Sequence, residues 1–170
     1  MLSEKLRIAG TVNDSIVDGP GIRFAIFTQG CPHHCEGCHN SHTHDFEAGE
    51  FVTLESLLDK IKSNPLLDGV TYSGGEPFCQ AKQLYTLGDE VKKLGMNIVT
   101  YTGYTYEYLT EHATPQNYYS ELLSVTDYLV DGPFELDKRD ILLKFKGSSN
   151  QRIINVKKSL AEKKVVEAEL

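Results

Sequence analysis

The sequence predicts an α/β protein with a mostly parallel sheet covered by helices. Short apolar runs typical of strands alternate with segments in which apolar residues recur at helical spacing. The loops that follow the strands are rich in glycine, and α/β folds usually place their sites after the carboxyl ends of strands. This alternation is typical of strand–helix–strand units, which build parallel sheets.

Six segments are expected to form strands, because each is mainly apolar and ends in turn residues. They are Leu6 to Val12, Ile22 to Thr28, Asp68 to Tyr72, Asn97 to Tyr101, Asp127 to Val130 and Gln151 to Val156.

Four segments are expected to form helices: Thr53 to Ser63, Ala81 to Leu94, Tyr104 to His112 and Asn117 to Val125. The first two each carry four apolar residues on one helical face: Leu54, Leu57, Leu58 and Ile61, then Leu84, Leu87, Val91 and Leu94. Pro115 separates the last two helices. The charged stretch from Lys157 to Leu170 is expected to be a helix or a frayed tail.

A complete eight-unit barrel needs about 250 residues, and this chain has 170. We therefore expect an incomplete, open (β/α) barrel. One domain is expected to span residues 1–170, with a core at about 6–156 and a charged tail at 157–170.

Composition narrows the class of protein. The chain is 40 % hydrophobic and 24 % charged, as is ordinary for a globular protein. Its net charge of −7 argues against nucleic-acid binding, which needs a basic surface. No apolar run reaches the length of a membrane span, and the first residues lack the apolar core of a signal peptide. Cysteines without an export signal favour the reducing cytoplasm.

The segment from Gln29 to Asn40, QGCPHHCEGCHN, carries three of the four cysteines. Cys31, Cys35 and Cys38 have the spacing C-x3-C-x2-C. Thiolates select zinc, Cu(I) or iron–sulfur clusters. Four thiolates complete a structural zinc site or ligate every iron of a [4Fe–4S] cluster, whereas three leave one position open.

Spacing alone leaves two kinds of metal site open. A closed zinc site is the alternative to a cluster, because a Cys3His set is available from nearby histidines: His33, His34, His39, His42 and His44. A disulfide framework fits poorly, since three clustered cysteines cannot all pair and no secretory signal precedes them.

The cysteine spacing resembles that of the radical S-adenosylmethionine (SAM) enzymes. The resemblance implies that Cys31, Cys35 and Cys38 hold a [4Fe–4S] cluster, and that the amino and carboxylate groups of SAM chelate the fourth iron. It also implies a partial (β/α) barrel whose open side admits the substrate. Many members have an aromatic residue before the third cysteine, where this chain has Gly37. Gly37 and His39, which flank Cys38, are expected to contact SAM.

A second string, SGGEP at residues 73–77, follows a predicted strand. Its glycines let the backbone approach a ligand closely, although alone it also fits a simple turn with a solvated glutamate. The string resembles the GGEP motif of radical SAM enzymes. That resemblance implies that Gly74, Gly75 and Glu76 hold the amino group of SAM. Cys79 is expected to be a small buried residue and not a ligand.

Four more strings are turn residues by composition: DGPGIR at 18–23, TYTGY at 100–104, DGPF at 131–134 and GSSNQR at 147–152. Together they resemble the glycyl-radical activating enzymes, most closely those that act on anaerobic ribonucleoside-triphosphate reductase. Arg152 is a candidate partner for the SAM carboxylate.

This resemblance implies an enzyme that takes an electron from a low-potential donor such as flavodoxin, cleaves SAM reductively and leaves a glycyl radical on the reductase. Two alternatives within the superfamily stay open: an activase of another glycyl-radical enzyme such as pyruvate formate-lyase, and a base-modifying enzyme. A non-catalytic Cys/His zinc-binding module is the alternative from a different class.

Overall fold

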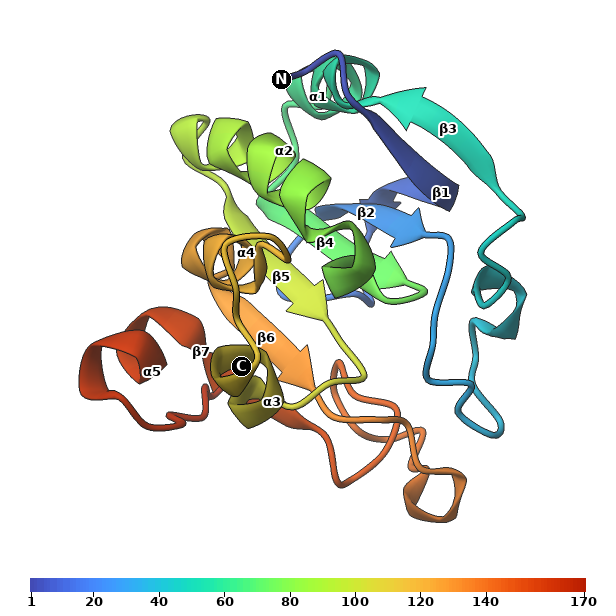
Figure 1. The fold of residues 1–170 in the computed structure, drawn as a ribbon, viewed down its shortest axis with the longest axis vertical. Coiled ribbons are helices and arrows are strands. Elements are labelled where there is room, and N and C mark those ends of the chain that lie inside the picture. Colours follow the sequence, from blue (N-terminus) through green and yellow to red (C-terminus); the bar gives the residue numbers. More distant parts are fainter.

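The structure, a computed structural model, describes all residues from Met1 to Leu170 and is built on one seven-stranded sheet (Figure 1). The strands are β1 (Lys5–Ser15), β2 (Arg23–Thr28), β3 (Glu50–Thr53), β4 (Gly69–Gly74), β5 (Asn97–Tyr101), β6 (Tyr128–Asp131) and β7 (Arg152–Asn155). They lie in the order β3-β1-β2-β4-β5-β6-β7. The four central strands β2, β4, β5 and β6 are parallel, and the outer strands pair antiparallel. The edge strands β3 and β7 do not meet, which confirms the predicted open α/β architecture.

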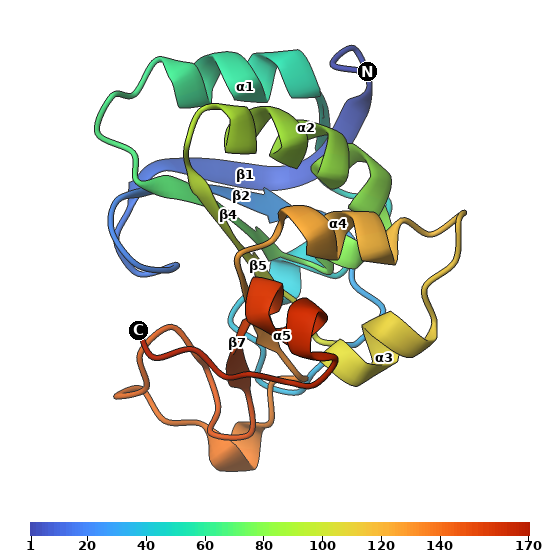
Figure 2. The ribbon, with the colours of Figure 1, turned by 90° about the vertical axis from the view of Figure 1, so that its left-hand side faces the viewer.

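Five α-helices connect or follow the strands: α1 (Leu54–Lys62), α2 (Ala81–Lys93), α3 (Tyr106–Glu111), α4 (Tyr119–Val125) and α5 (Val156–Glu162). Three short 3-10 helices lie in the loops: η1 (Ser41–Thr43), η2 (Pro77–Gln80) and η3 (Leu136–Lys138). Figure 2 shows α1 and α2 on one side of the sheet and the β1–β2 connection, in blue, on the other. None of the helices combines the length and apolar character that crossing a membrane requires.

Strand alternation gives the sheet two different faces. Because successive side chains point to opposite faces, one set of strand residues packs with the helices in the hydrophobic core: Phe24, Ile26, Val70, Tyr72, Ile98, Leu129 and Ile154. On the opposite face, Ser73 and Tyr101 border a cavity. The helices therefore bury one face of the sheet and leave the other free for a site.

Three of the five α-helices, α1, α3 and α5, begin at residues whose side chains cap them. The hydroxyl oxygen of Thr53 accepts a hydrogen bond from the Ser56 amide at the start of α1, and Thr105 and Asn155 cap α3 and α5 in the same way. The four predicted helices and six predicted strands are all present, with ends shifted by a few residues. The apolar face predicted for the first helix is buried.

One strand was not predicted, and the charged stretch expected to be a helix or a frayed tail begins as a helix. The short strand β3 was not predicted, because its four residues alternate too briefly to stand out and form a strand only by pairing with Lys5–Ile8. The expected tail begins as α5 at Val156, and the chain then returns along β7. The Asn155 amide donates to the Val166 carbonyl, and the Ala168 amide donates to the Ile153 carbonyl. The end of the chain thus covers the β7 edge of the sheet.

Arg23 fixes the loop between β1 and β2 to the sheet. Its side chain is fully buried and donates hydrogen bonds to the Thr71 hydroxyl and to the carbonyls of Pro20, Val70 and Asn97. Burial lowers the pKa of Arg23 to about 10, which leaves the guanidinium charged at neutral pH. Thr71 in turn donates to the Asp18 carbonyl. The DGPGIR string therefore places its loop against the free face of the sheet.

Arg152 joins β7 to β6 through the buried carboxylate of Asp131. Its Nε lies 3.0 Å from Asp131 Oδ1, and its Nη2 lies 2.6 Å from Glu107 Oε1 on the surface. The same guanidinium also lies 2.5 Å from Asp131 Oδ2, whose side chain is 1 % exposed. These hydrogen bonds raise the pKa of Arg152 and lower that of Glu107.

We predict that the two ion pairs of Arg152, with buried Asp131 and with exposed Glu107, differ sharply in their contribution to the free energy of unfolding. Arg152→Met leaves the buried Asp131 carboxylate with only the Tyr106 amide as a hydrogen-bond donor, so the free energy of unfolding should fall by about 3 kcal/mol. Glu107→Gln, the matched control, removes the exposed partner of the same arginine and should cost less than about 1 kcal/mol. Urea denaturation measures both values. Equal small losses would contradict the structural role given to Asp131.

Candidate active site

The cysteine loop leaves the carboxyl end of β2 and returns to the sheet through backbone hydrogen bonds. The Gly30 amide donates to the Thr43 carbonyl and the Cys31 amide donates to the His44 carbonyl. On the neighbouring strand, the Glu76 amide donates to the Gly30 carbonyl. The loop is therefore attached at its base to η1 and to the end of β4, and the cysteines follow this fixed point.

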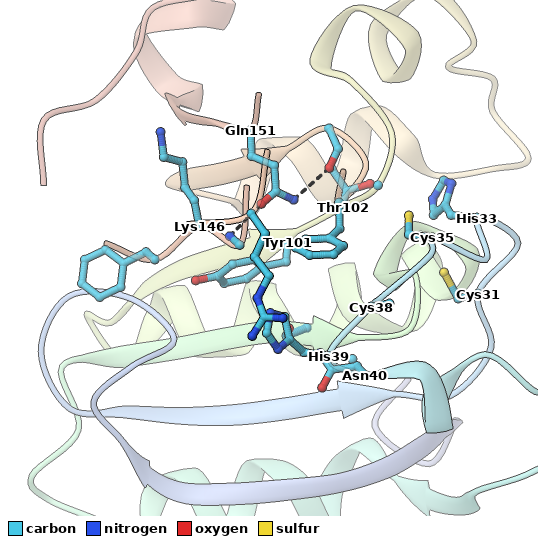
Figure 3. Close-up of a pocket in the computed structure, with 18 of the residues that line it drawn as sticks. Cys31, His33, Cys35, Cys38, His39, Asn40, Tyr101, Thr102, Lys146 and Gln151 are labelled. Carbon is cyan, nitrogen blue, oxygen red and sulfur yellow. Dashed lines mark hydrogen bonds between the residues drawn. The ribbon is translucent and has the colours of Figure 1, made fainter. Parts of the chain in front are cut away.

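All three cysteines of the loop line one cavity of about 500 Å³ on the free face of the sheet (Figure 3). This volume lies within the range of small-molecule sites, about 300–1,000 Å³. His33, His39 and His44 also line it. All four cysteines of the chain are free thiols. Burial raises the pKa of Cys31 to about 11 and also raises the pKa of Cys35, so both are neutral thiols until a metal displaces their protons.

The three thiols of the loop border one shared space, the cavity that Cys31, Cys35 and Cys38 all line. Three thiols around one space fit an iron–sulfur cluster, whose thiolate ligands bind different irons.

The two glycines of the SGGEP string lie where the end of β4 passes against the cysteine loop. Gly74 has φ +91°, and a Cβ there would collide with the backbone of Phe27 and Thr28. A Cβ on Gly75 would collide with the Gly30 carbonyl oxygen. Both glycines line the cavity. Their first physical role is therefore the close approach of two strand ends, which also exposes β4 backbone to the cavity.

Glu76 connects three segments with one buried carboxylate. Oε1 lies 2.6 Å from His33 Nε2 and accepts the Gly103 amide at 2.8 Å. The Thr102 hydroxyl lies 2.9 Å from both carboxylate oxygens, and Oε2 accepts the Phe78 amide at 3.0 Å. The residue is 1 % exposed. Its carboxylate therefore joins the cysteine loop, the exit of β5 and its own turn.

The glutamate is thus bonded to protein groups and is absent from the cavity lining. The role of the Glu76 side chain in binding the SAM amino group stays a prediction. Its partners were not predicted from the sequence. The one sequence feature related to them is Gly103 in the TYTGY string, because a Cβ at this position would collide with the His33 ring.

The residues that flank Cys38 differ in position. His39 lines the cavity, and its ring makes an edge contact with Phe134 at a centroid distance of 5.5 Å. Gly37 is exposed, lies outside the cavity lining and has φ +74°. A Cβ on Gly37 would lie 2.7 Å from Leu136 Cδ1. Leu136 from η3 therefore occupies the space beside Gly37.

The wall opposite the cysteines comes from residues 132–151. Gln151 accepts the Gly147 amide through Oε1 and donates to the Gly132 carbonyl through Nε2, which binds the DGPF and GSSNQR strings together. Arg139 and Lys146 also line the cavity, and sequence reasoning missed both because no motif marks them. Figure 3 shows Lys146 and Gln151 across the cavity from the cysteines, with Tyr101 between.

Two sequence expectations are wrong. Arg152 lies outside the cavity lining and is held by Asp131 and Glu107, so it is not positioned for the SAM carboxylate. Cys79 is exposed and not buried, because it lies in η2, whose Pro77 and Phe78 are the buried residues. Cys79 also lies outside the cavity lining, and its exclusion from the ligands stays a prediction.

Comparison with known proteins gives one family match and several relatives. Residues 17–154 match the family described as "4Fe-4S single cluster domain". The anaerobic ribonucleoside-triphosphate reductase-activating protein of Pasteurella multocida is 33 % identical over 147 residues, covering 81 % of this chain and 90 % of the relative. The corresponding protein of bacteriophage T4 is 30 % identical over 143 residues, covering 81 % of this chain and 86 % of the relative.

A second group of relatives consists of activating enzymes of pyruvate formate-lyase. The pyruvate formate-lyase 1-activating enzyme of Escherichia coli K12 is 36 % identical over 155 residues, covering 88 % of this chain and 60 % of the relative. Among solved structures, QueE from Escherichia coli matches with a TM-score of 0.46 and 22 % identity, covering 59 % of this chain and 54 % of that protein.

The family match includes the three cysteines, the SGGEP string and the strands that carry them. The cofactors of this group are a [4Fe–4S] cluster and SAM. The chain therefore belongs to the 4Fe–4S single cluster domain family, and within it to the radical SAM activating enzymes of glycyl-radical proteins.

Proposed function

We propose that this protein generates a glycyl radical on anaerobic ribonucleoside-triphosphate reductase by reductive cleavage of SAM. One observation carries the proposal: three free thiols and the exposed backbone of Gly74 and Gly75 border the same cavity on the free face of the sheet. A site for a cluster and a site for the ligand of its open iron are therefore adjacent.

Each cysteine has one role, which is to supply a thiolate. Cys31, Cys35 and Cys38 would hold the cluster, which would supply the electron for reductive cleavage of SAM to methionine and a 5′-deoxyadenosyl radical, and that radical would take a hydrogen atom from the target glycine. The chain does the rest: it positions the thiols, holds SAM and excludes water. The electron comes from a low-potential donor such as flavodoxin, and the free thiols are consistent with action in the cytoplasm.

The SAM amino group is proposed to bind where β4 ends. Gly74 and Gly75 present backbone to the cavity, and backbone carbonyls accept hydrogen bonds from an ammonium group. Glu76 adds negative charge just behind this backbone. Its carboxylate also holds His33, so we assign it a positioning role for the cysteine loop. His39 lines the cavity beside Cys38 and completes the proposed SAM contacts, whereas Gly37 lies outside the lining with Leu136 beside it and is assigned none.

The choice of the reductase rests on whole-chain resemblance. The DGPGIR, TYTGY, DGPF and GSSNQR strings most closely resemble those of the reductase-activating proteins. Each string has a structural role. The DGPGIR string fixes the β1–β2 loop to the sheet, the TYTGY string supplies hydrogen bonds to Glu76, and the DGPF and GSSNQR strings form the far wall of the cavity. Pyruvate formate-lyase is the second candidate partner, because its activating enzyme aligns with 88 % of this chain at 36 % identity.

Cysteine substitutions should distinguish the three cluster ligands from Cys79, which is not expected to bind the cluster. Changing Cys31, Cys35 or Cys38 to Ala should abolish cluster assembly, because each change removes one of three thiolates. Cys79→Ala is the matched control and should keep full iron and sulfide content after anaerobic reconstitution. The readouts are iron and sulfide per chain and the brown colour of the sample. If Cys31→Ala retained the cluster and Cys79→Ala lost it, the assignment of the cysteine ligands would be refuted. One tightly bound zinc ion in a colourless wild-type sample would refute the presence of a cluster.

Partner choice is tested by offering two substrates. This protein, SAM and a reductant should produce the electron paramagnetic resonance doublet of a glycyl radical on anaerobic ribonucleotide reductase from the same organism. Pyruvate formate-lyase in the same assay should give little or no signal. A strong doublet on pyruvate formate-lyase with none on the reductase would favour the second candidate and leave the cluster chemistry intact.

A further inference from the structure

The entrance of the cavity is bordered by two loop tips that lie far apart in the sequence. One tip, Ile16 and Val17, belongs to the β1–β2 connection. The other, Ile141 and Leu142, lies between η3 and β7. Val17 and Ile141 both line the cavity. The two tips therefore border the same opening, and we call the four residues the rim.

The rim is apolar and almost fully in contact with solvent. Ile16 and Val17 are each 71 % exposed, Ile141 is 81 % exposed and Leu142 is 88 % exposed. Elsewhere in the chain, only Met1 and Leu66 are large apolar residues with comparable exposure, at 81 % and 69 %. Clustered exposed aliphatic side chains mark surfaces that another molecule covers. Their position at the cavity entrance indicates that this molecule reaches into the site.

One tip of the rim is also strongly basic. The segment KRDILLKFK at residues 138–146 carries four basic residues and one acidic residue, in a chain of net charge −7. Arg139, Lys144 and Lys146 have no carboxylate within ion-pairing distance, whereas Lys138 pairs with Glu135 at 3.6 Å. On the facing loop, the carboxylate of Asp18 accepts a hydrogen bond from Ser15. Three cations without an ion-pair partner therefore lie on the same loop as Ile141 and Leu142, together with one carboxylate, Asp140, which accepts the Leu142 amide.

We propose that the rim and its basic neighbours dock the glycine-bearing segment of the partner protein, and that this segment carries apolar and acidic side chains beside its glycine. The proposal rests on the proposed function and names the surface that recognises the partner. Apolar partner residues are buried against the rim, and acidic ones pair with Arg139, Lys144 or Lys146. The glycine itself has no side chain, so its backbone passes between the tips toward the cavity floor.

The test uses two rim residues that do not line the cavity, one on each tip. The double variant Ile16→Asp/Leu142→Asp should keep cluster content and SAM affinity, since neither side chain borders the cofactor space. Its affinity for the intact reductase should fall about tenfold or more, and the rate of glycyl-radical formation at limiting partner concentration should fall with it. Leu66→Asp, an equally exposed apolar position away from the cavity, is the matched control and should bind as the wild type does.

Charge gives an independent arm of the same test. Lys144→Glu should weaken partner binding further, and the wild-type affinity should decrease as salt rises. Unchanged partner affinity and radical yield in the double variant would overturn the proposal. It would also be overturned if the double variant only converts a wild-type dimer to a monomer, because the rim would then join two copies of this chain.

The outcome is distinguishable from failure of the proposed function. If the wild type does not bind the reductase but binds pyruvate formate-lyase, the choice of partner is wrong. The affinity of the same variants for pyruvate formate-lyase then tests the rim. If the wild type makes a radical on either partner and the double variant equals it, the function stands and the rim proposal falls.

Discussion

The buried carboxylate of Glu76 is the interaction on which the site depends. An unpaired charge in the interior is costly, and here His33, Thr102, Gly103 and Phe78 all supply partners. The exposed loop between Cys31 and Cys35 has few other anchors, so the hydrogen bond from His33 restricts where these thiols lie. The neighbouring glycines allow the same contact from the backbone side, because any side chain at Gly75 would push the loop away from β4.

The open sheet explains why the rest of the chain is arranged as it is. Helices bury one face, and the other is covered only by long loops that need their own anchors. Buried Arg23 holds the β1–β2 loop through carbonyl and hydroxyl groups, and Arg152 holds β7 against β6 through Asp131. These two arginines support opposite sides of the cavity, and each loop carries one apolar tip of the rim. A site built between loops stays accessible to a macromolecular substrate.

The sequence predicted the parts of the fold and site that depend on local patterns. Helical spacing identified α1 and α2, and the spacing of Cys31, Cys35 and Cys38 identified a group of thiols that the structure brings to one cavity. The distant partners of Glu76, Thr102 and His33, were not predictable, because they lie 26 and 43 residues away and leave no periodic signal. The same reason accounts for β3, which exists only through pairing, and for Arg152, whose carboxylate partners lie on β6 and α3. Arg139 and Lys146 belong to a loop that only the fold places beside the cysteines.

The central claim is that three thiolates hold a four-iron cluster whose fourth iron is free to bind SAM. Mössbauer spectroscopy of protein reconstituted with ⁵⁷Fe tests this most directly, because it resolves individual iron sites. On addition of SAM, the signal of one iron should shift toward higher coordination while the other three stay unchanged. Spectra that do not respond to SAM, or four equivalent irons each with a protein ligand, would contradict the account.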